Sequence, residues 1–281
     1  MKNIIIGTAG WRMKYGNSHK ILSTEEISAL IHHFKSINIR SFDTASNYGD
    51  AENILFTQLG KNNFVDTKLE SFSDLNVFKK LLAQKTKLPI NVLYFHDPKV
   101  FEKFSSRDLN QCVRLIRQNG FAAGFSIYDK KDIVNNLQFF NAAENKIQLP
   151  SHIFDLTILD EAIKRKLKPK NVNLRSFFAR GLLFLSSNKI KKILGKKYLY
   201  VKNGFEEVYN MSFTPENSQM LSYSLINYLT SRNFGCIVGL NSIEEVNFFV
   251  GKCDSAKKYS LDWEKIISCS NKLIDIQEIN L

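Results

Sequence analysis

The feature that most constrains the fold of this chain is a regular alternation of short apolar runs with amphipathic stretches. Short buried runs separated by helical periods are typical of parallel strands joined by crossover helices. The eight expected strands cover residues 4–7, three runs that end at residues 43, 68 and 96, and residues 122–127, 146–149, 172–177 and 236–239. Eight strand–helix units in 281 residues, with no Pro/Gly/Ser-rich linker, predict an α/β fold, namely one (β/α)8 TIM barrel that spans residues 1–281 as a single domain.

The first expected helix shows the pattern that the later helices repeat. Ser23 supplies a polar N-cap, and Glu25 and Glu26 place acids in the first turn. One apolar stripe follows, made of Ile27, Leu30, Ile31 and Phe34. The other expected helices cover residues 51–59, 75–82, 109–116, 131–137, 158–164, 218–229 and 243–250, and a last amphipathic segment covers 263–274. Residues 184–214 are predicted to form a long irregular loop with some helix in it.

Composition excludes several classes of protein. Hydrophobic residues make up 44% of the chain, which predicts a soluble globular protein with a full core. No stretch approaches the roughly 20 apolar residues of a membrane span, and the N-terminal apolar run is too short for a signal peptide. The cysteines (Cys112, Cys236, Cys253 and Cys269) form no CxxC pair, so we expect reduced thiols in a cytoplasmic protein. No metal-ligand spacing occurs, so no metal is expected.

The net charge of +12 raises the question of a nucleic-acid partner. Lysines and arginines cluster at 164–170 and at 189–197, and such runs can attract polyanions. Basic runs are weakly specific, and these lie at a helix end and in a connecting segment. We therefore expect a solvated surface and no nucleic-acid site, with a positive rim that can steer an anionic cofactor or substrate.

Four polar residues stand at or just after the ends of three successive strands. Asp43 ends the second expected strand and Tyr48 follows five residues later, Lys68 ends the third strand, and His96 ends the fourth. In a (β/α)8 barrel the carboxyl ends of the strands form the active-site face. Taken singly, each residue has an ordinary structural role, as a cap, a surface charge or a packing residue. Their order and position together favour a catalytic site.

These residue types can deliver a proton to a carbonyl oxygen. Tyrosine has an ordinary pKa of about 10, and an ammonium beside it favours the phenolate and lowers that pKa. Lys68 can supply the ammonium, and Asp43 can keep the buried lysine charged. His96 can donate a hydrogen bond to the substrate oxygen.

This arrangement resembles the catalytic tetrad of the aldo-keto reductase family over most of the chain. The resemblance implies an NAD(P)H-dependent oxidoreductase that reduces an aldehyde or ketone. It makes Tyr48 the general acid, Lys68 and Asp43 its tuning pair, and His96 the orienting group. The alternative is a barrel that binds the nucleotide as a sensor or accessory protein and does no chemistry.

The same resemblance implies where the nicotinamide cofactor binds, since the chain has no G-x-G-x-x-G loop for a Rossmann-type site. Segments similar to the family's cofactor face occur after the first strand, on the fifth and sixth strands, after the seventh strand and in the last strand–helix turn. The residues so implied are Gly7, Thr8, Ser126, Gln148, Ser176, Phe177, Gly181, Gly239, Ser242 and Glu245. A turn that feeds a helix N-terminus is a suitable phosphate site.

Departures from the family pattern affect the choice of cofactor. Ile127 stands where many members carry Asn. The last turn contains Glu244 and Glu245 but no arginine for a 2′-phosphate. NADPH is therefore the cofactor that the resemblance implies, and NADH is the alternative.

The substrate pocket is expected near Trp11 and Arg12, beside Tyr48 and His96. Trp11 can wall the pocket or pack in the core, and Tyr15 and the pair Tyr94–Phe95 are further candidates near the mouth. Arg12 favours an anionic substrate. The segment from Gly7 to Gly16 looks like a bacterial subgroup of short members that resemble sugar-modifying enzymes, so a keto-sugar or nucleotide-linked sugar, and a place in carbohydrate metabolism, is a hypothesis. The sequence does not fix the oligomeric state.

Overall fold

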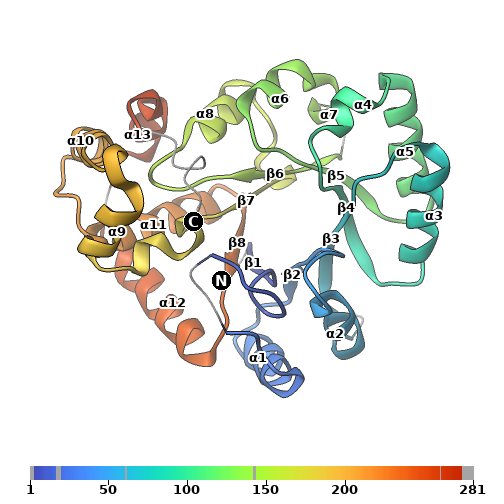
Figure 1. Ribbon diagram of the computed structural model, residues 1–281, viewed down its shortest axis with the longest axis horizontal. Coiled ribbons are helices and arrows are strands. Elements are labelled where there is room, and N and C mark those ends of the chain that lie inside the picture. The colour runs from blue at the N-terminus through green and yellow to red at the C-terminus, as the bar shows by residue number, and fades with distance from the viewer. Residues whose placement is uncertain (1–2, 17–19, 61, 142–143, 260, 274–281) are drawn as a thin grey trace.

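The structure, a computed structural model, describes residues 3–16, 20–60, 62–141, 144–259 and 261–273. Its parallel strands close into a barrel in the order β1 to β8, and Figure 1 shows helices arranged around them. The strands are β1 Ile4–Gly7, β2 Ser41–Asp43, β3 Phe64–Leu69, β4 Ile90–Phe95, β5 Ala122–Ser126, β6 Lys146–Pro150, β7 Val172–Arg175 and β8 Gly235–Gly239. The predicted (β/α)8 barrel is therefore confirmed, and each expected strand lies within two residues of its place.

The α-helices cover most of the segments between the strands. They are α1 Thr24–Ser36, α2 Ala51–Gln58, α3 Leu75–Lys85, α4 Val100–Lys103, α5 Ser106–Gln118, α6 Lys130–Asn135, α7 Leu137–Asn141, α8 Thr157–Lys164, α9 Ser187–Leu194, α10 Tyr198–Tyr209, α11 Pro215–Ser231, α12 Ile243–Ala256 and α13 Trp263–Ser268. Short 3-10 turns lie at η1 Pro169–Asn171, η2 Ala179–Phe184, η3 Gly195–Lys197 and η4 Ser270–Lys272. In α1 the Ser23 side chain accepts from the Glu26 N–H, and the Glu26 side chain accepts from the Ser23 N–H, as in a capping box.

One segment differs clearly from its prediction. The expected irregular loop at 184–214 is mostly helical, because it contains α9 and α10. Ile190 and Leu194 are buried on α9, and Val201, Phe205 and Tyr209 are buried on α10 at a spacing of four residues. This spacing is a helical period, so the apolar pattern outweighs the lysine-rich composition. The last expected segment ends at 274, which lies outside the described residues.

The barrel interior is unusually polar. Because neighbouring strands share a register, residues paired across the sheet point to the same face. Asp43 pairs with Asp66, Lys68 with Tyr94, and Gln148 with Asn173. Inside the barrel, Lys68 and Gln148 both donate to Asp43, and Asn173 donates to Asp66 and Tyr94. Branched apolar residues dominate at such positions in most TIM barrels.

Two glycines make room for this interior. A Cβ built on Gly124 would overlap the Tyr94 ring, and a Cβ built on Gly235 would overlap the side-chain amide of Asn173. Both neighbours point into the closed barrel and cannot turn away. Glycine at these positions is therefore required by space.

We expect Gly124→Ala to lower the free energy of unfolding by about 1–3 kcal/mol, the usual cost of overpacking a core. Gly251→Ala is the matched control, because Gly251 lies on α12 with no atom near its missing Cβ. That variant should be more stable by about 0.5–1 kcal/mol, since alanine favours helix more than glycine does. Urea denaturation of both variants measures the difference, and equal effects would contradict the packing account.

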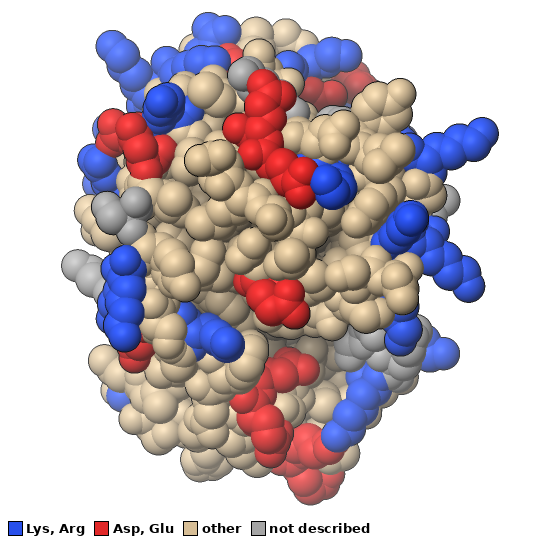
Figure 2. Space-filling view, turned by 90° about the vertical axis from the view of Figure 1, so that its left-hand side faces the viewer, with Lys and Arg blue, Asp and Glu red and all other residues tan. Residues whose placement is uncertain are grey.

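Charged side chains on the outside are interspersed. On the face shown in Figure 2, lysines and arginines lie mostly toward the margins, with acidic side chains between them. In the two basic clusters and next to them, Lys164 pairs with Asp160 at 2.5 Å, Arg165 with Glu161 at 2.7 Å, and Lys202 with Glu206 at 2.6 Å. The absence of a nucleic-acid site stays a prediction. Over the described residues, the helices are all too short or too polar to cross a bilayer.

Candidate active site

A buried ion pair lies at the carboxyl ends of β2 and β3. Lys68 Nζ donates to Asp43 Oδ2 at 2.6 Å and to the Thr44 carbonyl oxygen at 3.0 Å. The two charged side chains are almost fully shielded from solvent, with 2% and 6% of their surface exposed. Burial lowers the pKa of Lys68, but Asp43 and Tyr48 outweigh it and bring the pKa above its usual value. Lys68 is therefore an ammonium at neutral pH.

Tyr48 lies in the turn between β2 and α2, next to this pair. Lys68 Nζ is 5.3 Å from the centre of the Tyr48 ring. Burial raises the pKa of Tyr48, and the Lys68 ammonium lowers it by a smaller amount. The sequence-based expectation of a lowered pKa is thus corrected in sign, because burial outweighs the ammonium. The hydroxyl keeps its proton at neutral pH, as a proton donor must.

His96 follows β4 and faces Tyr48. The two ring centres are 6.3 Å apart and meet edge to face. Burial, followed by the charges of Lys68 and Arg175, lowers the pKa of His96 to about 4. The imidazole is therefore neutral at pH 7, and one ring nitrogen carries a hydrogen that can be donated. The structure brings together all four residues of the predicted tetrad.

Besides Tyr15, which was expected near the mouth, two side chains that were not predicted as site residues lie there, Arg175 and Tyr128. Arg175, at the end of β7, lies with its guanidinium 4.3 Å from the centre of the Tyr128 ring and donates to the Ile127 carbonyl oxygen at 3.2 Å. Tyr15 and Tyr128 both act electrostatically on Tyr48. Arg175 ends a strand whose alternate residues point inward, and that alternation was the available sequence signal.

Two of the predicted cofactor residues carry buried polar atoms without a partner. Ser126 is the last residue of β5, and Gln148 lies on β6. The Ser126 Oγ and Gln148 Oε1 atoms make no hydrogen bond. The other end of the Gln148 amide donates to Asp43 Oδ1. Ser126 pairs with Gln148 across β5 and β6. Buried polar groups are normally paired, so a ligand with both donors and acceptors would satisfy these two atoms.

The residues after β1 are engaged within the protein. Gly7 ends β1, where a Cβ would come 3.1 Å from the Ile237 side chain. The Thr8 N–H donates to the Asp43 carbonyl oxygen at 2.9 Å, and its hydroxyl donates to Thr44 Oγ1 at 2.9 Å. Gly7 and Thr8 therefore lie next to Asp43 and form part of the surface around it.

The loop after β7 has an unusual backbone. Ser176 has φ 70°, Arg180 has φ 53° and Gly181 has φ 88°, all in the left-handed region. Phe177 between them is buried. Gly16 fits against this loop, because a Cβ there would overlap the Arg180 carbonyl oxygen. Such conformations cost about 1–3 kcal/mol at a non-glycine residue and concentrate at functional loops.

The last predicted cofactor segment runs from Gly239 to Glu245. Ser242 is the N-cap of α12 and accepts from the Glu245 N–H at 3.2 Å. Glu245 accepts in turn from the Asn241 N–H at 2.7 Å. A carboxylate of the chain itself thus occupies part of the helix N-terminus at which a phosphate would bind.

The predicted substrate residues Trp11 and Arg12 are both held by other contacts. Trp11 is fully buried and its indole N–H donates to the Leu240 carbonyl oxygen at 3.1 Å. Of the two roles considered, this favours packing. Arg12 pairs with Asp50 at 2.5 Å and also donates to the Leu22 carbonyl oxygen at 2.6 Å. Its guanidinium is committed to these partners.

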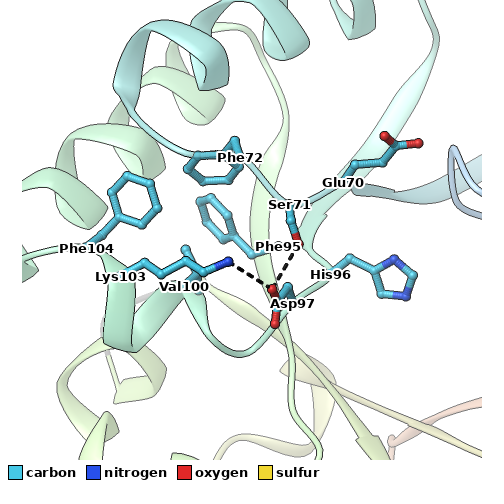
Figure 3. Close-up of a pocket in the computed structure, with 9 residues that line it drawn as sticks. All are labelled: Glu70, Ser71, Phe72, Phe95, His96, Asp97, Val100, Lys103 and Phe104. Carbon is cyan, nitrogen blue, oxygen red and sulfur yellow. Dashed lines mark hydrogen bonds and ion pairs between the residues drawn. The ribbon is translucent and has the colours of Figure 1, made fainter.

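The pair Tyr94–Phe95 does not line the mouth as expected. Adjacent strand residues point to opposite faces, so Tyr94 points into the barrel and Phe95 points out toward the helices. A shallow pocket lies on that outer side (Figure 3). It is lined by Glu70, Ser71, Phe72, Phe95, His96, Asp97, Val100, Lys103 and Phe104.

Figure 3 shows the His96 ring directed away from the aromatic side chains of this pocket. Asp97 accepts from Ser71 Oγ at 2.9 Å and pairs with Lys103 at 3.5 Å. Its carboxylate is satisfied by neighbouring residues. The pocket therefore borders the candidate site without replacing the barrel mouth as its centre.

Comparison with known proteins gives a consistent result for the fold. No family model and no curated protein matches the chain. A solved structure of a Pseudomonas aeruginosa protein assigned to the aldo-keto reductases matches with a TM-score of 0.63 and 12% identity, over 91% of each chain. An aldo-keto reductase from a deep-sea metagenome matches with a TM-score of 0.59 and 14% identity, over 100% of this chain and 96% of the other. The chain has the aldo-keto reductase fold. A silkworm aldo-keto reductase in complex with NADPH matches with a TM-score of 0.59 and 14% identity, over 97% of this chain and 84% of that one.

The aldo-keto reductase fold gives the candidate site its setting. All four tetrad residues lie at the end of the barrel formed by the carboxyl ends of the strands, which is the usual place for an active site in a TIM barrel. Within the part of the chain that the structure describes, no three His, Cys, Asp or Glu side chains are grouped to hold a metal ion.

Proposed function

We propose that this protein is an NAD(P)H-dependent carbonyl reductase that converts an aldehyde or ketone to an alcohol. The observation that carries the proposal is the geometry around Lys68, which lies 2.6 Å from Asp43 Oδ2 and 5.3 Å from the centre of the Tyr48 ring. Burying an ion pair carries a large desolvation penalty, so stability alone does not explain a buried lysine–aspartate pair next to a tyrosine ring. Its position at the barrel mouth supports a proton-transfer role.

Tyr48 is the general acid in this proposal. Its hydroxyl is protonated at neutral pH, and the ammonium of Lys68 stabilises the phenolate that forms once the proton has left. Asp43 keeps Lys68 charged. A positioned general acid contributes about 10²–10⁴ in rate.

His96 orients the carbonyl. Because its imidazole is neutral, it can donate one hydrogen bond to the substrate oxygen without competing as an acid. Its ring meets Tyr48 edge to face, so a carbonyl oxygen between the two side chains would face both donors.

A nicotinamide cofactor fits the unpaired groups at the mouth. Ser126 Oγ can donate or accept, and Gln148 Oε1 can accept from an amide N–H, which suits a carboxamide. The reduced nicotinamide, when bound, supplies the hydride. The silkworm neighbour was solved with NADPH, which supports the same class of cofactor here.

The proposed substrate is a carbonyl compound that carries a negative charge, with a nucleotide-linked keto-sugar as the working hypothesis. Arg175 supplies the cationic group at the mouth that was first expected of Arg12, and it is close enough to lower the pKa of His96. Turnover of a simple aromatic aldehyde but of no anionic or keto-sugar substrate would argue against this class.

We expect Glu245→Gln to shift cofactor preference toward NADPH by about five- to tenfold. Removing one carboxylate charge near a 2′-phosphate is worth about 1 kcal/mol, and glutamine can still accept from the Asn241 N–H. Fluorescence titration gives the ratio of the Kd values for NADPH and NADH. Glu264→Gln, on an exposed glutamate of α13, is the control and should leave the ratio unchanged. If the Kd ratio is unchanged in Glu245→Gln, the adenosine end of the cofactor does not bind next to Glu245.

The proposed function is tested by titrating the protein with NADPH and NADH and then following cofactor oxidation with a panel of aldehydes and ketones. Binding together with oxidation supports the reductase. Binding without turnover of any carbonyl supports the alternative of a nucleotide sensor or accessory protein. Failure to bind either nucleotide removes both proposals.

A further inference from the structure

A second carboxylate lies inside the barrel, below the tetrad. Asp66 is on β3, two residues before Lys68, so both side chains point inward. Its carboxylate accepts from Asn91 Nδ2 at 3.0 Å and from Asn173 Nδ2 at 3.2 Å. Only 6% of the residue is exposed. Among the residues that the structure describes, no lysine or arginine forms an ion pair with Asp66, and a buried carboxylate without a paired cation is costly.

A chain of contacts connects Asp66 to the tetrad. Asn173 Nδ2 also donates to the Tyr94 hydroxyl at 3.0 Å, and the Gln148 amide lies beside that hydroxyl. Gln148 donates to Asp43 Oδ1, while Asp43 Oδ2 accepts from Lys68 at 2.6 Å. Gly124 and Gly235 leave the space that Tyr94 and Asn173 fill, so the connection depends on at least two further positions of the chain.

We infer that Asp66 is a positioning residue for the proton donor: its hydrogen bonds help to fix the side chains that hold Asp43, and its charge acts on Lys68, which lies over the Tyr48 ring. The inference rests on the proposed function, in which Tyr48 is the general acid. Asp66 itself touches neither substrate nor Tyr48. It acts through the Asp43–Lys68 pair.

The charges around Asp66 make its ionisation sensitive to neutral pH. Asp43 faces it from β2, Lys68 from β3, Tyr94 from β4 and Lys146 from β6. Burial, reinforced by the charge of Asp43, raises the pKa of Asp66 to about 7, while the hydrogen bond from Asn91 and then the charges of Lys68 and Lys146 oppose the rise. When Asp66 is ionised it offsets part of the Lys68 charge. When it is neutral, Lys68 acts more strongly on Tyr48 and favours the phenolate.

Carbon-13 NMR of tyrosine-labelled protein without cofactor or substrate tests the inference. The Tyr48 signal is assigned from its absence in Tyr48→Phe. In Asp66→Asn, which keeps the size of the side chain, the pKa of Tyr48 should fall by about one pH unit. Asp254→Asn, a surface change of the same charge on α12, should leave the pKa of Tyr48 unchanged. An equal pKa of Tyr48 in wild type and Asp66→Asn would overturn the inference.

The wild-type protein provides a second test that needs no folded variant of Asp66. The Tyr48 signal should show a small inflection at the pH where the Asp66 carboxyl signal titrates, and a curve without it would overturn the inference.

If carbonyls are reduced, the high-pH limb of kcat should move down by about one pH unit in Asp66→Asn, which a purely structural loss would not cause. If no carbonyl is reduced, the proposed function fails while the NMR titration still decides the role of Asp66.

Discussion

Replacing Tyr48 with phenylalanine should lower kcat for carbonyl reduction by about a thousandfold, within the usual range for a general acid. The change removes the hydroxyl that donates the proton and keeps the ring that packs against His96 and over Lys68. Nucleotide affinity should stay within about twofold, because the predicted cofactor contacts lie on other strands. Steady-state kinetics and a nucleotide titration on the same preparation measure both quantities.

Tyr200→Phe is the matched control for Tyr48→Phe. Tyr200 is 68% exposed on α10, so loss of its hydroxyl should leave kcat unchanged. A Tyr48→Phe protein with wild-type kcat would remove Tyr48 from the mechanism.

Replacing Lys68 with methionine should abolish reduction and lower the free energy of unfolding by about 3–5 kcal/mol, the usual cost of leaving one partner of a buried ion pair alone. Asp43 would be left buried without its cationic partner, with the Gln148 amide still donating to Oδ1. The double variant Asp43→Asn with Lys68→Met should recover part of this stability and none of the activity. Urea denaturation and single-turnover assays separate the two effects.

A second buried ion pair supplies the control for Lys68→Met. Lys85 on α3 lies 2.5 Å from Glu52 on α2, with 9% of each side chain exposed, outside the barrel. Lys85→Met should destabilise the protein by a similar amount and leave kcat per folded molecule unchanged. If Lys85→Met lost activity as Lys68→Met does, the loss would reflect stability and not proton transfer.

The barrel, and the meeting of Asp43, Tyr48, Lys68 and His96 at its mouth, were predictable because each depends on local pattern. Strands in a closed parallel barrel are buried on both faces, so they appear as short apolar runs, and β1 begins and ends where the sequence predicts. The tetrad residues lie at strand ends, where one rule of the fold places active sites. The helix α1 was predictable from its cap and apolar stripe.

Other parts of the site depend on contacts between distant residues. Arg12 pairs with Asp50 and Trp11 bonds to Leu240, and no local pattern specifies either partner. The pKa of Tyr48 depends on the balance of burial against the Lys68 charge, which needs the packed structure. The inward direction of Asp66 and Tyr94 could have been predicted. Each lies two residues before a tetrad residue, Lys68 or His96, and alternate strand residues point to the same face.

The central claim is hydride transfer to a carbonyl at this barrel mouth, and transfer of an isotope label tests it most directly. The protein is incubated with NADPH or NADH deuterated at the transferred position of the nicotinamide, together with a panel of carbonyl compounds, and the alcohols are analysed by mass spectrometry. We expect deuterium on the carbinol carbon with the wild-type protein and none above background with Tyr48→Phe. If the protein binds the nucleotide but every carbonyl compound is recovered unreacted, with no labelled alcohol, the claim is contradicted.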